Sequence, residues 1–152
     1  MNQKIQLEFY FWVFTLVVAA GILLPILSTL PDYRFLLPNI VYIVVAITMT
    51  RYLFLLKHTF LAKRQVLKVA ISLLCIPLLF YLVQALNGFQ TFLDEEGPEA
   101  IVGPLAYSSR SGLMTYIRSE MLLFGVASII SAFVLPFRLI LSVWRTRNRG
   151  TV

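Results

Sequence analysis

The chain has 152 residues, of which 59% are hydrophobic and only 13% charged, and its formal net charge is +6. A soluble domain of this length is roughly half apolar and a quarter charged, so a fold that is soluble throughout is excluded. The single cysteine, Cys75, excludes an intramolecular disulfide. Because the cations lie at the ends of long apolar runs, we read them as membrane topology signals and expect no nucleic-acid partner.

The first apolar run carries no charge from Phe9 to Pro31. This is long enough to cross a hydrocarbon core of about 30 Å, and it predicts a transmembrane helix near residues 9–30. A cleaved signal peptide ending at Ala20 is the alternative. The apolar run continues through Leu27, beyond a normal signal core, so we expect the span to be retained.

A second span is predicted near residues 36–57. Pro38 suits its first turn, where a missing N–H costs nothing. Only sixteen residues, from Phe35 to Thr50, precede Arg51, which is short for a span. We therefore expect Arg51 inside the helix, with its side chain snorkelling to the lipid interface. A strongly basic loop over residues 57–67 follows.

The third span is predicted near residues 68–87, with Asn87–Gly88 as its C-terminal stop. Residues 88–111 then form an acidic loop. Four of its residues are carboxylates, and it also contains many apolar side chains. We expect this loop to be ordered, to contain a short helix or turn before Ser111, and to leave its acidic cluster exposed. Arg110 and Arg118 could pair with these acids, although exposed pairs contribute little.

The fourth span is predicted near residues 112–144. Within it Gly125, Ser128 and Ala132 fall at i, i+3 and i+7, which makes a strip of small residues along one face. Such a strip lets another helix approach closely. That helix belongs either to this chain or to another subunit, and packing within the chain is the interpretation we favour.

The distribution of charge predicts the orientation. Four spans place both termini on one side, together with the basic loop. That side then holds one acid, Glu8, and ten cations: Lys4, Arg51, Lys57, Lys63, Arg64, Lys68, Arg138, Arg145, Arg147 and Arg149. The other side holds six acids and three cations, Arg34, Arg110 and Arg118. By the positive-inside rule the termini are cytoplasmic.

The sequence thus predicts an all-α polytopic membrane protein of one domain, with four transmembrane helices arranged as two helical hairpins, in a bacterial cytoplasmic (inner) membrane.

Arg51 and Arg138 are the candidate functional residues, because each stands at a similar depth on a helix that runs toward the basic side. One interpretation is that both snorkel to lipid phosphates. The other is a cationic pair that binds an anion, a lipid headgroup or a carboxylate of a partner. Glu8 is the only carboxylate of the chain on the same side of the membrane as these arginines. It could neutralise one of them, and the other arginine would then stay unpaired.

Catalytic, cofactor and metal sites are not predicted. The single histidine, His58, lies in the basic loop, and no GxSxG or CxxC motif occurs. No Asp, Glu or Lys falls in the central third of any predicted span, so a relay of intramembrane carboxylates is not supported. We therefore expect the protein not to be an enzyme and to need no cofactor.

These features predict an accessory or scaffolding subunit of a larger inner-membrane assembly. Its expected partners are the bilayer, anionic lipid headgroups, and other membrane subunits or further copies of the chain. Two alternatives remain open at this point. One is a homo-oligomeric channel or transporter for an anionic solute that uses Arg51 and Arg138. The other is a membrane sensor or lipid-binding module.

Overall fold

The structure is a computed structural model that describes residues 3–103 and 105–149, apart from the side chain of Lys4. That side chain, one of the predicted cytoplasmic cations, and Pro104 of the acidic loop lie outside the described residues. In chain order the elements are α1 (Gln3–Thr29), α2 (Leu36–Leu55), the 3₁₀ turns η1 (Leu56–His58) and η2 (Phe60–Lys63), α3 (Gln65–Glu95), the short α4 (Glu99–Val102) and α5 (Tyr107–Asn148). The described residues contain no strand.

Four helices, α1, α2, α3 and α5, are long and apolar enough to cross a membrane. Many of their large hydrophobic side chains face outward, including Leu16, Leu74, Phe80 and Leu123. An apolar exterior over four long helices fits a small integral membrane protein, because lipid takes the place of a buried core around them.

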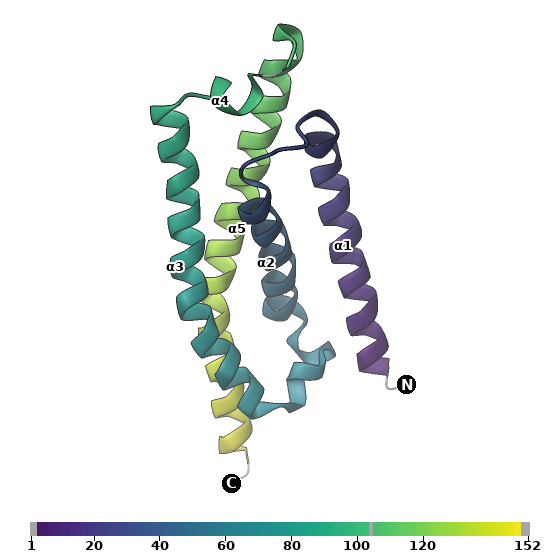
Figure 1. Ribbon diagram of the computed structural model, residues 1–152. Coiled ribbons are helices and arrows are strands. Elements are labelled where there is room, and N and C mark those ends of the chain that lie inside the picture. Colours follow the sequence, from purple (N-terminus) through teal and green to yellow (C-terminus); the bar gives the residue numbers. More distant parts are fainter. Residues whose placement is uncertain (1–2, 104, 150–152) are drawn as a thin grey trace.

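The longest helix, α5, is the one on which the bundle is built. It packs extensively on both α2 and α3, whereas α2 and α3 contact each other little. The first helix packs mainly on α2, and Figure 1 shows it diverging from α5 toward its N-terminal end. Gly125 explains the close approach of α5, because a Cβ at this position would lie 3.1 Å from Leu86 Cδ1 and 3.8 Å from a ring carbon of Tyr42.

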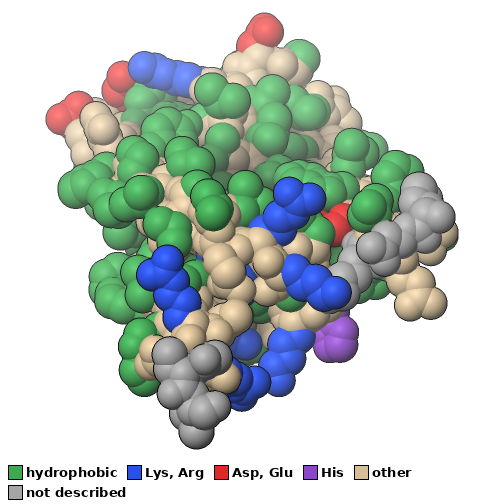
Figure 2. All heavy atoms as spheres, turned by 90° about the horizontal axis from the view of Figure 1, so that it is seen from below, with side chains coloured by type: hydrophobic (Ala, Val, Ile, Leu, Met, Phe, Trp, Pro, Cys, Tyr) green, Lys and Arg blue, Asp and Glu red, His purple; other side chains and the backbone are tan. Residues whose placement is uncertain are grey.

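The two ends of the molecule differ in charge. Both described chain ends and the η1–η2 segment lie at one end, which we call the basic end (Figure 1). Figure 2 looks onto it and shows Lys and Arg side chains spread across its surface. At the opposite, acidic end lie the α1–α2 turn and α4, with four exposed carboxylates nearby: Asp94, Glu95, Glu96 and Glu99. The prediction that this acidic cluster is exposed is confirmed.

The predicted end of the third helix at Asn87–Gly88 is wrong. Helix α3 continues to Glu95, because Phe89 and Phe92 on its extra turns pack edge-on against Phe35, each with ring centroids 5.1 Å apart. Gly97 takes the expected role of the terminal glycine, with a φ of 80° just past the helix. The predicted loop 88–111 is correspondingly shorter.

Two other helices also extend beyond their predicted bounds, whereas α2 ends at Leu55, two residues before its predicted end. Helix α1 begins at Gln3, so Glu8 lies inside it rather than in a polar lead. Helix α5 begins at Tyr107, five residues before the predicted start of the span at 112. The short helix predicted before Ser111 is confirmed as α4. Arg110 pairs with backbone rather than with the acids: its guanidinium donates to Leu105 O at 2.8 Å and to Gly103 O at 2.7 Å.

Candidate functional site

Arg51 and Glu8, both singled out in the sequence, meet in the interior near the basic end. Arg51 Nη2 on α2 donates to Glu8 Oε2 on α1, and the two side chains are only 5% and 11% exposed. Arg51 is inside the helix as predicted, but the prediction that it snorkels to the lipid interface is wrong. The Glu8 carboxylate takes the place of a lipid phosphate as the partner of the Arg51 guanidinium. This pairing compensates the cost of burying the arginine's charge.

The surroundings of this ion pair hold it in place. The Arg51 guanidinium lies over two aromatic rings, 4.9 Å from the centroid of Phe11 and 4.7 Å from that of Tyr52. Glu8 Oε1 also accepts the backbone N–H of Phe60 at 3.4 Å. The carboxylate therefore connects α1, α2 and η2. One donor stays without a partner, since Arg51 Nε is buried and makes no hydrogen bond.

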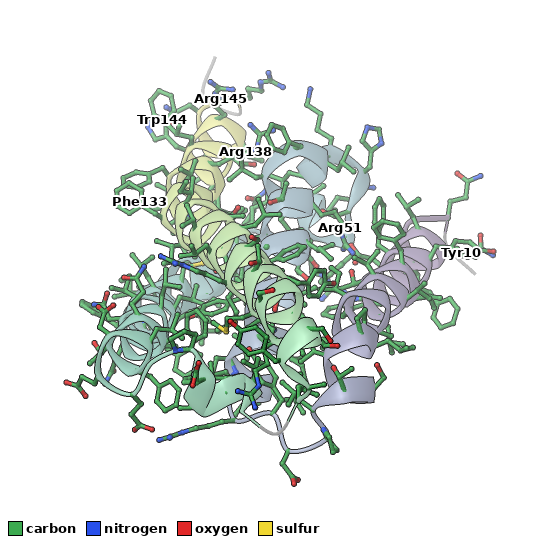
Figure 3. The ribbon with its side chains drawn as sticks, turned by 90° about the horizontal axis from the view of Figure 1, so that it is seen from above. Tyr10, Arg51, Phe133, Arg138, Trp144 and Arg145 are labelled. Atoms are coloured by element: carbon green, nitrogen blue, oxygen red, sulfur yellow. The ribbon has the colours of Figure 1, made fainter. Side chains whose placement is uncertain are left out.

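Arg138 does not join this pair. Its side chain is exposed and lines a groove between the end of α2 and the last turns of α5, whereas Arg51 lines a separate groove next to α1. Figure 3 shows Arg51 between α2 and α1, and Arg138 on α5. The two arginines thus have different environments, one neutralised inside the chain and the other open to its surroundings.

The small-residue strip on α5 faces the interior of the chain. Gly125, Ser128 and Ala132 are all buried, and Gly125 lies against Leu86 and Tyr42. Nearby, Tyr42 donates a hydrogen bond from its hydroxyl to Leu82 O at 3.1 Å, which links α2 to α3. In this structure the strip serves the packing of α5 on α2 and α3.

Sequence reasoning missed a second buried polar cluster, at the acidic end. Asn39 Nδ2 on α2 donates to Glu120 Oε1 on α5. Three buried atoms of the cluster make no hydrogen bond in the described structure: Asn39 Oδ1, Glu120 Oε2 and the Tyr33 hydroxyl. Burial, and then the nearby charge of Glu120, raise the pKa of Tyr33 well above its usual value. The available signal was a lone asparagine early in the second apolar run and a lone acid within the fourth helix.

Lys68 is the other residue whose environment the sequence did not reveal. The sequence placed it only among the cations of the basic side, at the start of the third span, and in the structure it is only 1% exposed. Its ammonium group donates to Ala62 O at 2.8 Å, Gln65 Oε1 at 3.3 Å and Ser142 Oγ at 2.9 Å. Three acceptors match its three protons, which compensates its burial. The contact with Ser142 ties the start of α3 to the end of α5.

The described residues contain no group of three or more His, Cys, Asp or Glu side chains that could hold a metal ion. Glu8, Arg51, Asn39, Glu120 and Lys68 instead connect helices to one another, as the Thr50–Ser131 hydroxyl contact at 3.1 Å also does. Comparison of the chain with protein-family models, with curated proteins and with solved structures finds no match.

Proposed function

We propose that the protein is a non-enzymatic accessory or scaffolding subunit of a larger assembly in a bacterial inner membrane. The observation that carries this proposal is the way α1 diverges from α5. Between them lies an apolar groove of about 500 Å³ whose lining comes from α1, α2 and α5. A groove of this kind is suited to the side chains of a transmembrane helix from another subunit.

The lining of this groove, which we call the α1 groove, supports a helix as the occupant. Ala46 and Ala127 lie on its α2 and α5 sides, and small residues let two helices approach closely in lipid. Bulky side chains surround them: Phe11, Phe14, Ile47, Phe54, Leu55, Leu123 and Phe124. A partner helix with Leu, Ile or Phe at i, i+3 or i+4 spacing could place these large side chains against Ala46 and Ala127.

Orientation is part of the proposal. The cation bias of the basic end supports a cytoplasmic position for the termini and for the η1–η2 segment. The acidic end would then face the opposite side.

The engagement of the polar groups supports a structural role over transport. Arg51 is neutralised by Glu8, Lys68 has three acceptors, and Asn39 bonds to Glu120. Arg51, one of the two arginines of the anion-channel alternative, therefore has its charge paired within the chain. The anion-channel alternative draws no support from it.

Site-specific photocrosslinking in native membranes tests the proposal. A photoreactive residue replaces Phe14 or Leu123, which line the α1 groove from two different helices. The matched control replaces Phe80, an exposed residue of α3 outside this groove. We expect both groove positions to crosslink to the same membrane protein, identified by mass spectrometry, and the control to give no such adduct. Lipid adducts alone at all three positions would show that no subunit occupies the groove.

A further inference from the structure

A second groove lies at the basic end, and its cations are arranged differently from those of the predicted arginine pair. The groove has a volume of about 530 Å³ and lies between the end of α2 and the last turns of α5. Its lining includes four cations, Lys57, Arg138, Arg145 and Arg149, and no carboxylate. We call it the basic groove.

Helix geometry explains why three of these cations share one groove. Arg138, Arg145 and Arg149 stand at i, i+7 and i+11, which places them along one face at the end of α5. Within the described residues no carboxylate lies within ion-pair distance of these three side chains. Figure 3 shows Phe133 and Trp144 on the other side of α5, pointing away from the bundle. The basic groove therefore brings together the positive charges of Arg138, Arg145 and Arg149, which no described carboxylate pairs with.

The hydroxyl of Ser142, which contacts the buried cation of Lys68, adds a neutral hydrogen-bond donor to the site. Ser142 lines the basic groove between Arg138 and Arg145, and its Oγ accepts a hydrogen bond from the buried ammonium of Lys68 at 2.9 Å. That bond leaves the hydroxyl proton of Ser142 available to donate into the groove. A buried lysine behind the hydroxyl strengthens it as a donor to an anion.

The apolar part of the lining indicates the kind of anion. Leu53, Val134 and Phe137 line the groove on the side toward the middle of the helices, while Arg145 and Arg149 lie at the end of the molecule. A ligand that fits both parts carries a phosphate at one end and a hydrocarbon chain at the other. We propose that the basic groove binds the phosphate headgroup of an anionic phospholipid, with an acyl chain along Val134 and Phe137. This inference goes beyond the proposed function and does not depend on the α1 groove.

The test measures lipid retention by the purified full-length chain in detergent, using native mass spectrometry. Phosphatidylglycerol and phosphatidylcholine with identical acyl chains are titrated in parallel. We expect one phosphatidylglycerol to be retained at concentrations at least tenfold below those needed for phosphatidylcholine. Equal retention of the two lipids would overturn the proposal, because a hydrocarbon surface alone would account for it.

Two triple variants locate the site. In Arg138→Gln/Arg145→Gln/Arg149→Gln the groove loses three cations, and the preference for phosphatidylglycerol should fall at least tenfold. The matched control, Lys63→Gln/Arg64→Gln/Arg147→Gln, removes the same charge from exposed residues at the same end that do not line the groove. It should change retention less than threefold. Equal losses in both variants would assign the effect to general surface charge and overturn the site.

A soluble competitor separates a lipid from a free anion. Glycerol phosphate offers the same phosphate chemistry without the acyl chains. Under the proposal, millimolar glycerol phosphate leaves phosphatidylglycerol bound, since it cannot fill the apolar part of the groove. Displacement of the lipid by glycerol phosphate at these concentrations would identify the basic groove as a site for soluble anions and overturn the lipid assignment.

Discussion

Arg51 of α2 and Glu8 of α1 form an ion pair that is almost fully buried, and Glu8 also accepts the N–H of Phe60 in η2. This relationship connects the first helix to the rest of the bundle at the end where it diverges from α5. Elsewhere α1 is held by packing on α2 and by a hydrogen bond from the Tyr116 hydroxyl to Ile22 O at 2.8 Å. The position of α1, and with it the shape of the α1 groove, depends strongly on this pair.

We predict that removing either member of the pair destabilises the fold. Glu8→Leu leaves the Arg51 charge buried and unpaired, and Arg51→Leu does the same to the carboxylate, so each should lower the free energy of unfolding by about 3–5 kcal/mol. The double variant should cost much less than the sum of the two. Denaturant titration in mixed micelles measures all three. Additive losses would show that the two charges do not interact.

Two glycines provide a matched test of helix packing. A bulky side chain at Gly125 would meet Leu86 and Tyr42, so Gly125→Leu should separate α5 from its neighbours and cost about 1–3 kcal/mol. At Gly88 nothing lies within 4 Å of the Cβ position, and Gly88→Leu should be neutral or stabilising because glycine disfavours a helix. Thermal unfolding in detergent compares them. Tolerance of leucine at position 125 would contradict the close contact with α3.

Tyr33 contributes to the loss of stability in alkali. Its pKa in the folded protein is raised above the ordinary value of 10.0 by burial and by the charge of Glu120. In the unfolded chain the hydroxyl ionises near pH 10, whereas in the folded protein it stays protonated, so alkali favours unfolding. The stabilising contribution is fully present below about pH 10 and declines as the pH rises above it.

We therefore expect Tyr33→Phe, which cannot ionise, to lose less stability than the parent between pH 9 and pH 11. Thermal unfolding measured across this range is the readout. Tyr107→Phe is the control, because the Tyr107 side chain is exposed. This substitution removes one exposed phenol hydroxyl and keeps the buried hydroxyl of Tyr33. Identical pH profiles for the parent and Tyr33→Phe would contradict the assignment.

Topology is tested by labelling. Single cysteines at Lys63 and Glu96, in a Cys75→Ser background, stand at the basic and acidic ends and are both exposed. With an impermeant thiol reagent, intact cells should label position 96, and position 63 should react only after the cells are opened. Labelling of both cysteines from the same side of the membrane would contradict the four-span arrangement. The parent thiol of Cys75 is buried and should react slowly.

The sequence by itself determined the four long apolar helices, the position of Arg51 inside the second, and the exposed acidic cluster near a short helix. These follow from local properties, since the length of an uncharged run and the spacing of charges act along the chain. It also identified Glu8 as the one carboxylate on the same side as Arg51 and Arg138. It misjudged the end of α3, because Gly88 ends a helix only where nothing beyond it packs, and Phe89 and Phe92 pack on Phe35.

Only the tertiary structure decided which polar groups meet. Arg51 and Arg138 look alike in the sequence, yet one pairs with Glu8 and the other lines the basic groove. Lys68, counted in the sequence only as one of the cations of the cytoplasmic side, is buried against Ser142, which lies 74 residues later in the chain. Which face of each helix turns toward α5 depends on how the helices rotate and approach one another. That rotation is set by side-chain packing across the whole bundle. No single run of residues in the sequence specifies it.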